Sequence, residues 1–135
     1  MDIILNIGLD GVPVDGETYT NGVRNTRRVE QFFAVVHAAR RLEFQIVGAH
    51  LHQSDTEPTA VLTVRHPAPS NLHGYVRRLA AALNQTCIAA WKIDRQRGVM
   101  LGRTIDHDDS WGPFDPAKFL MPDGTRLSEN LSRAI

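Results

Sequence analysis

Cysteine and lysine are scarce in this 135-residue chain, and each scarcity narrows the functions open to it. The one cysteine, Cys87, excludes an intramolecular disulfide and gives no sign of an oxidising compartment. Because Cys87 begins a predicted strand, we interpret it as a structural thiol rather than a nucleophile. With only two lysines, arginine supplies nearly all of the basic side chains. Arginine suits carboxylate and phosphate partners, although a GC-rich genome explains the same bias without any function.

Long apolar runs and a net charge are also missing. No apolar run approaches 18 residues, so we expect no membrane span. Residues Met1–Leu5 carry neither a basic region nor a small-residue cleavage site, which predicts no signal peptide and hence a cytoplasmic protein. The formal net charge is zero, so charge gives no reason to expect binding to nucleic acid or to anionic membranes.

The common catalytic and ligand-binding motifs are absent from the sequence. It contains no GxSxG, HExxH or CxxC motif, and neither of the glycine-rich patterns GxxxxGK[ST] and GxGxxG. Its tyrosines and tryptophans are scattered, and they do not form the aromatic pattern with which a four-stranded sheet stacks RNA bases. We therefore predict no cofactor and no metal, and we do not expect nucleic acid as a partner.

The hydrophobic and charged contents, 42% and 22%, are those of a globular domain, and the apolar residues recur at strand and helix spacings. The predicted order is strand, helix, strand, strand, helix, strand, over 3–9, 25–41, 44–53, 59–66, 70–84 and 87–93. We therefore predict an α+β fold: a ferredoxin-like β-α-β-β-α-β sandwich over residues 1–103, with an extra C-terminal strand at Val99–Gly102. Residues 104–135 are predicted to form a C-terminal extension that packs on this domain through Trp111, Phe114, Phe119 and Leu120.

Both helices have recognisable ends and one apolar stripe each. Asn25 or Thr26 is expected to cap the first helix, and Ser70 the second, which should stop at Asn84. Asp115 is expected to cap a short helical turn that has Pro116 at its first position. The residues predicted to face the sheet are Val29, Phe32, Phe33, Val36 and Ala39 in the first helix, and Leu72, Val76, Leu79, Ala80 and Leu83 in the second.

The two strands of the predicted hairpin allow two assignments of their faces. In the first, Val47, Ala49 and Leu51 lie under the helices, and the opposite face is a polar row with Asn6, Gln45, His50, His52, Val61, Thr63 and Arg65. We expect that face to be open, or to be covered by dimerisation, by the C-terminal tail or by a ligand. In the second, Phe44 and Ile46 are buried together with His50 and His52, because a slip of one residue exchanges the faces. We prefer the first assignment, which buries no imidazole.

Two histidines, His50 and His52, are the weak catalytic candidates. Their alternation places both imidazoles on one face of a strand, about 7 Å apart. Histidines at this spacing can share a metal ion or act as a general base. A third ligand is missing, however, because the hairpin register places His66 too far from His52. We favour exposed or interface histidines.

Arg24, Arg27 and Arg28 surround the start of the first helix, after a glycine-bearing loop. Helix N-terminal amides and guanidinium groups together bind anions, so a nucleotide-like ligand is predicted here. The alternative is that these arginines line a solvated helix face. The candidate ligand-binding residues are Arg24, Arg27, Arg28, His50, His52 and Arg65.

The sequence as a whole favours a non-catalytic binding protein over an enzyme. We expect it to act through homo-oligomerisation and through a protein partner or an anionic, nucleotide-like ligand. Small accessory proteins of bacteria and phages, including inhibitors of host defence enzymes, often have this size and lack active-site motifs. The alternative is a small enzyme of the dimeric α+β barrel type that uses His50 or His52 on the open sheet face.

Overall fold

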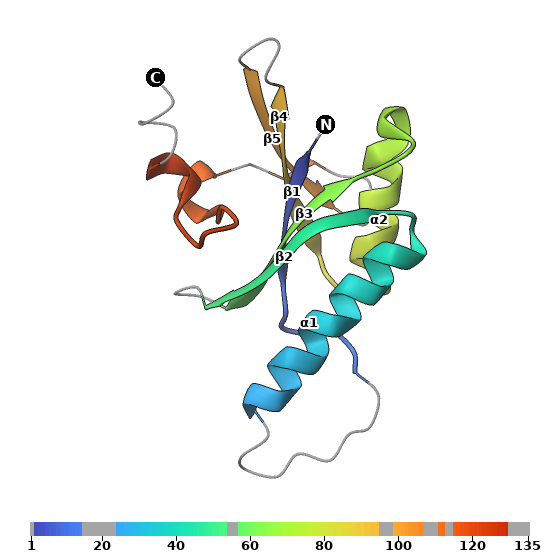
Figure 1. The fold of residues 1–135 in the computed structure, drawn as a ribbon, viewed down its shortest axis with the longest axis vertical. Coiled ribbons are helices and arrows are strands. Elements are labelled where there is room, and N and C mark those ends of the chain that lie inside the picture. The colour runs from blue at the N-terminus through green and yellow to red at the C-terminus, as the bar shows by residue number, and fades with distance from the viewer. Residues whose placement is uncertain are drawn as a thin grey trace.

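The computed structural model describes residues 2–14, 24–53, 57–94, 99–106, 111–112 and 115–129, with 24–26, 69, 92–94, 99–106 and 111–112 described by their backbone alone. The predicted α+β class is confirmed, with helices and an antiparallel sheet (Figure 1). The elements are β1 (Ile3–Gly8), α1 (Arg24–Arg41), β2 (Gln45–Gln53), β3 (Pro58–Arg65), η1 (Pro69–Asn71), α2 (Leu72–Ala82), β4 (Cys87–Asp94), β5 (Val99–Asp106), β6 (Trp111–Gly112) and η2 (Pro116–Lys118), where η marks a 3₁₀ turn.

The strands form one sheet in the order β2-β3-β1-β4-β5-β6, and every neighbouring pair is antiparallel. β3 therefore lies between β1 and β2, which α1 connects. Helix α1 packs against β2 and β3, whereas α2 packs against β4 and β5. The strand predicted at Val99–Gly102 continues to Asp106, because β5 pairs with β4 along its whole length. β5 thus crosses the boundary at residue 103, and the division into domain and extension stays a prediction.

A β-bulge in β2 combines the two face assignments made from the sequence. Ile46 pairs with Val64, but Gly48 pairs with the next residue, Thr63, so Val47 has no partner on β3. In a regular strand, residues three positions apart point to opposite faces. Because the bulge adds one residue, Ile46 and Ala49 point to the same face, and both pack against the core under the helices. The preferred assignment is therefore right from Ala49 onward. It is wrong at Val47, whose side chain is 48% exposed.

Helix α1 is rotated relative to the predicted stripe. Val35 and Ala39 face the sheet and are buried, and so is Gln31, whose amide donates to the backbone oxygen of Val12 at 3.1 Å. Val29 and Phe33 are 44% and 55% exposed, so their predicted burial is wrong. The inward position taken by Gln31 explains this, because each residue turns the helix by about 100° and carries these two side chains to a flank.

Most predicted helix ends are shifted, although the second apolar stripe is confirmed. Helix α1 begins at Arg24, so Asn25 and Thr26 lie inside it, and the turn η1 places the start of α2 beyond Ser70. Asn84 has φ 54° just after α2, as expected of a left-handed stop. The Asp115 side chain accepts from the Ala117 amide at 3.0 Å, which confirms the predicted cap. Val76, Leu79, Ala80 and Leu83 are buried.

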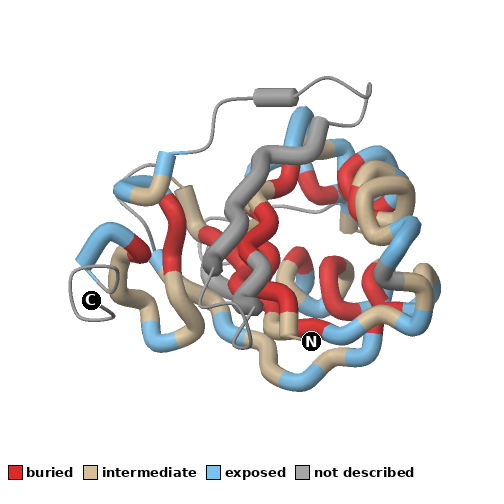
Figure 2. The backbone as a smooth tube through the Cα atoms, turned by 90° about the horizontal axis from the view of Figure 1, so that it is seen from above, coloured by how far each residue is buried: buried red, intermediate tan, exposed pale blue. Residues whose placement is uncertain are grey.

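The face of the sheet opposite the helices carries a second core, so over this area it is covered by the C-terminal segment, one of the alternatives expected from the sequence, and is not open. Phe119, Leu120 and Leu127 of the C-terminal segment pack there against strand residues that include Ile4 and Trp91. Figure 2 shows buried stretches (red) in the strands, in the helices and in this segment. Phe119 and Leu120 thus pack on the domain as expected, whereas Phe114 and the side chain of Trp111 lie outside the described residues.

Asn6 fastens the C-terminal segment to the central strand β1. Its Nδ2 donates to the Leu120 oxygen at 2.9 Å, and its Oδ1 accepts from the Leu120 amide at 2.8 Å. One half-buried amide therefore satisfies both backbone groups of Leu120 over an otherwise apolar surface. We expect this pair of hydrogen bonds to hold the second layer in register.

We predict that Asn6→Ala lowers the free energy of unfolding by about 1–3 kcal/mol, because the backbone groups of Leu120 lose both partners. Urea denaturation measures this change. Gln53→Ala, which removes an exposed amide from β2, is the control. Equal losses in the two variants would contradict an anchoring role for Asn6.

Candidate functional site

The structure places the six predicted ligand-binding residues in two separate regions. His50, His52 and Arg65 lie on the sheet face that also bears Asn6 and Val61. Arg24, Arg27 and Arg28 lie on α1, on the other side of the sheet. A single ligand therefore does not contact both groups, and each region is considered by itself.

His52 is held by the turn of the C-terminal segment at 121–124. Its Nε2 lies 2.9 Å from the Pro122 oxygen, which can only accept, so Nε2 is the donor. The ring packs on Gly124, whose φ of 85° suits glycine and where a Cβ would come within 2.9 Å of the ring. Hydrogen bonds from Thr125, with a smaller contribution from His52, lower the pKa of the neighbouring Asp123 carboxyl. His52 is therefore a packing and hydrogen-bonding residue in this arrangement.

The other predicted members of this region are exposed. The His50 ring stacks on His52, with centroids 5.9 Å apart, and Arg65 forms an ion pair with Asp2 at 2.7 Å. Within the described residues, no three histidine, cysteine, aspartate or glutamate side chains gather where they could hold a metal ion. Because the second core lies beside the two histidines, this face offers a substrate little room.

His66 is a third engaged histidine, and sequence reasoning missed its role. Its Nε2 lies 2.9 Å from the Leu42 oxygen, and its Nδ1 accepts from the Ala68 amide at 3.1 Å. Its ring packs between Phe44 and Tyr75, with centroids 4.7 and 4.1 Å away. These contacts fix one neutral tautomer and join the end of α1 to α2, which is a structural role.

Arg28 links α1 to the end of β1. Its guanidinium lies 2.8 Å from Asp10 Oδ1 and donates to Gln31 Oε1 at 3.0 Å. An anionic ligand at Arg28 would have to compete with Asp10. Arg27 is half-buried, and the side chain of Arg24 lies outside the described residues. The anion site at the start of α1 stays a prediction.

A second carboxylate, Glu57, adjoins Asp10 and Arg28. It lies over Gly8, where a Cβ would collide with it. Burial raises the pKa of Glu57; a hydrogen bond from the Asp10 backbone opposes this rise, the Asp10 charge adds to it, and the Arg28 charge opposes it. The folded protein therefore holds the Glu57 proton more tightly than the unfolded chain does. The ionised carboxylate makes the folded state less stable than a neutral side chain there would.

We predict that Glu57→Gln is more stable than the wild type at pH 7, because it removes this ionised carboxylate and keeps an acceptor for the Asp10 backbone. The wild type loses stability as the pH rises through the raised pKa, so the difference should shrink as the pH falls below the ordinary value of 4.5. Thermal melts between pH 4 and 8 measure it. Glu30→Gln, on the exposed side of α1, controls for the lost charge, and an equal effect there would contradict the prediction.

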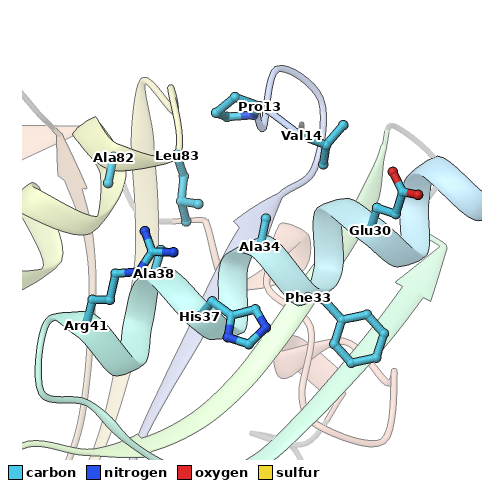
Figure 3. A pocket seen from close by; sticks show the side chains of 10 residues that line it. All are labelled: Pro13, Val14, Glu30, Phe33, Ala34, His37, Ala38, Arg41, Ala82 and Leu83. Atoms are coloured by element: carbon cyan, nitrogen blue, oxygen red, sulfur yellow. The ribbon is translucent and has the colours of Figure 1, made fainter. Parts of the chain in front are cut away.

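The groove along α1 is a binding feature that sequence reasoning did not identify. It has a volume of about 490 Å³ and is lined by α1 residues from Glu30 to Arg41, by Pro13 and Val14 after β1, and by Ala82 and Leu83 at the end of α2 (Figure 3). Ala34 and Ala38 keep its α1 side low and apolar. The rotation of α1 that exposes Phe33 also exposes the α1 wall of the groove, and the apolar stripe predicted from the sequence did not indicate a groove there.

Charge is segregated although the chain as a whole is neutral. The sequences of α1 and α2 contain seven arginines and one acidic residue, Glu30, so these helices carry +6 and the rest of the chain −6. Arg40, Arg41 and Arg78 are exposed on this helix layer. The layer therefore presents a mainly basic surface beside the groove, with Glu30 and Glu43 as exposed acidic residues.

Known proteins give no further guide to the site. Comparisons with protein families, with curated proteins and with solved structures found no match for this chain. Among the described residues, no helix is long and apolar enough to cross a membrane. The candidate site is therefore the α1 groove with its basic surroundings, identified by geometry and charge alone.

Proposed function

We propose that the chain is a non-catalytic, homo-oligomeric binding protein whose α1 groove takes an acidic amphipathic segment of a partner protein. The observation that carries this proposal is the position of a groove with both apolar and charged lining residues within a helix layer whose helices carry +6. A protein of this kind acts as an accessory or an inhibitor of its partner. For the fold we propose the ferredoxin-like plan with an extra strand and a C-terminal extension, which the element order and strand order support.

The shape of the groove suits a helix or an extended peptide. From Glu30 to Arg41 it follows α1 for about 16 Å, three turns at 1.5 Å per residue. Ala34 and Ala38 allow close approach, and Leu83 and Val14 offer apolar contacts on the opposite wall. Amphipathic segments bind in such grooves through side chains at helical spacing.

The charge around the groove selects the kind of segment. Arg41 lines the groove, and Arg40 and Arg78 are exposed on the same layer, whereas Glu30 is the one acidic residue in α1. A segment with acidic residues beside its apolar ones would be attracted by the layer, and a basic segment would be repelled. Complementarity of this kind gives specificity more than raw affinity.

The other predicted functions have weaker support. A nucleotide-like ligand at the start of α1 would have to displace Asp10 from Arg28. Chemistry at His50 or His52 would take place beside the second core, with His52 already bonded to Pro122. Neither arrangement offers an open pocket with a free catalytic group, so the protein segment is the partner we favour.

A synthetic helix of about twelve residues, with leucines at helical spacing and glutamates elsewhere, tests the proposal, because it spans the same ~16 Å as the groove. We predict that fluorescence anisotropy detects binding of this peptide and that added salt lowers its affinity. Arg41→Glu should raise the dissociation constant about tenfold, which corresponds to roughly 1.4 kcal/mol.

The control peptide has lysine in place of glutamate, and the control variant is Lys118→Glu, on the C-terminal segment. Equal binding of the two peptides, or an equal loss in Lys118→Glu, would overturn the proposal. Binding of neither peptide would overturn it as well.

A further inference from the structure

Large apolar side chains are exposed at one end of the described structure. Val29 and Phe33 of α1 and Val47 of β2 are 44%, 55% and 48% exposed, and they are the exposed large apolar side chains of the described residues. Both elements lie at the same end of the sheet, because β2 is its terminal strand and α1 packs on β2 and β3. The three side chains thus belong to one end of the molecule.

Val29 lies on the flank of α1 that faces away from the groove, and Phe33 lies between this flank and the groove, whose rim it also lines. Successive residues of a helix are turned by about 100° around its axis. Val29 is therefore turned by about 100° from Glu30, and Phe33 by the same angle from Ala34, and both Glu30 and Ala34 line the groove. Figure 3 shows the Phe33 ring directed away from Pro13 and Val14. Since the groove side of α1 faces α2, the opposite flank faces the β2 edge of the sheet. Val29 and the β2 edge are therefore separate from the proposed peptide site, whereas Phe33 borders both.

The β2 edge itself is suited to pairing with another strand. Within the described sheet β2 has one neighbour, β3, so its outer backbone groups have no strand partner there. Natural edge strands are commonly protected by charged residues or proline, and Gln45–Gln53 contains no lysine, arginine, aspartate, glutamate or proline. The bulge at Ile46–Gly48 leaves the stretch from Gly48 to Gln53 in regular register.

We propose that a second copy of this chain covers this end, with β2 pairing antiparallel to the partner's β2 and the Val29–Phe33 flank of α1 packing on the same flank of the partner. A strand paired with itself across a twofold axis is antiparallel, which continues the pattern of this sheet. This dimer specifies the oligomer in the proposed function, and its β2 pairing does not involve the groove.

The size of the surface is adequate for a dimer. The nine residues of β2 and the eighteen of α1 have similar lengths, about 30 Å and 27 Å. With sheet and helix layers about 10 Å apart, the end presents roughly 30 Å by 20 Å, or about 600 Å² in projection. A standard interface takes about 800 Å² of accessible surface from each partner, which is in the same range.

Charge gives this dimer a salt dependence opposite to that of the peptide complex. Each α1 carries five arginines and one glutamate, so bringing two copies of α1 together opposes like charges. Salt screens this repulsion and should tighten the dimer, whereas it should weaken an acidic peptide in the groove. The two proposals can therefore fail separately.

Sedimentation equilibrium of the full chain tests the dimer. We predict that the wild type is a dimer at micromolar concentration. In Val29→Glu and Val47→Lys, two changes outside the groove, the dissociation constant of the dimer should rise at least tenfold. Ala81→Glu, at an exposed position of α2, is the control and should leave the dimer intact. Circular dichroism confirms that each variant is folded, which the exposure of both wild-type side chains favours.

A wild type that is monomeric at about 100 µM, where a micromolar dimer would be assembled, overturns the proposal. A dimer that survives both substitutions overturns it too, because the interface then lies elsewhere. Hydrogen exchange tests the strand pairing: the outer β2 amides should be protected in the wild type and exposed in Val47→Lys. Equal exchange in both would reject the pairing of β2 with its copy.

Discussion

The central strand β1 has to be covered on both faces, and most of the architecture follows from this constraint. Ile3, Leu5 and Ile7 belong to the core under the helices, while Ile4 belongs to the second core on the other side. The helices cover one side of such a strand, and the segment 115–129 covers the other. Asn6, the one amide among these apolar residues, is used to fix that segment in place. The second layer is therefore part of the folded core.

Much of the fold could be predicted because periodicity reports burial directly. The alternation in Ile3–Gly8 and the stripe in α2 are typical of elements with one or two buried faces, and both were identified from the sequence. The bulge at Val47 could not be predicted, because both neighbouring registers bury apolar residues and the sequence does not distinguish them. The rotation of α1 was missed for a similar reason: Gln31 is polar, and its burial depends on an acceptor at Val12, nineteen positions earlier.

The candidate site was less accessible to sequence reasoning than the fold. The arginines at the start of α1 were identified, but the pairing of Arg28 with Asp10 depends on where β1 ends relative to the helix. The histidines were placed on the correct face, yet their covering by the C-terminal segment depends on a contact between positions 52 and 122. The groove required the relative placement of α1, α2 and the end of β1, which no local pattern contains.

The zero net charge of the chain conceals an uneven distribution of charge along the sequence. The two helices carry +6 and the rest of the sequence carries −6, so the helices are the basic part of the chain. Under the proposed function, the acidic partner would be attracted to the helices during its approach, before any contact forms. Such steering raises the fraction of productive encounters without adding a contact to the final complex. Because the net charge stays at zero, the chain also lacks the nonspecific attraction to anionic molecules that an overall positive charge would cause.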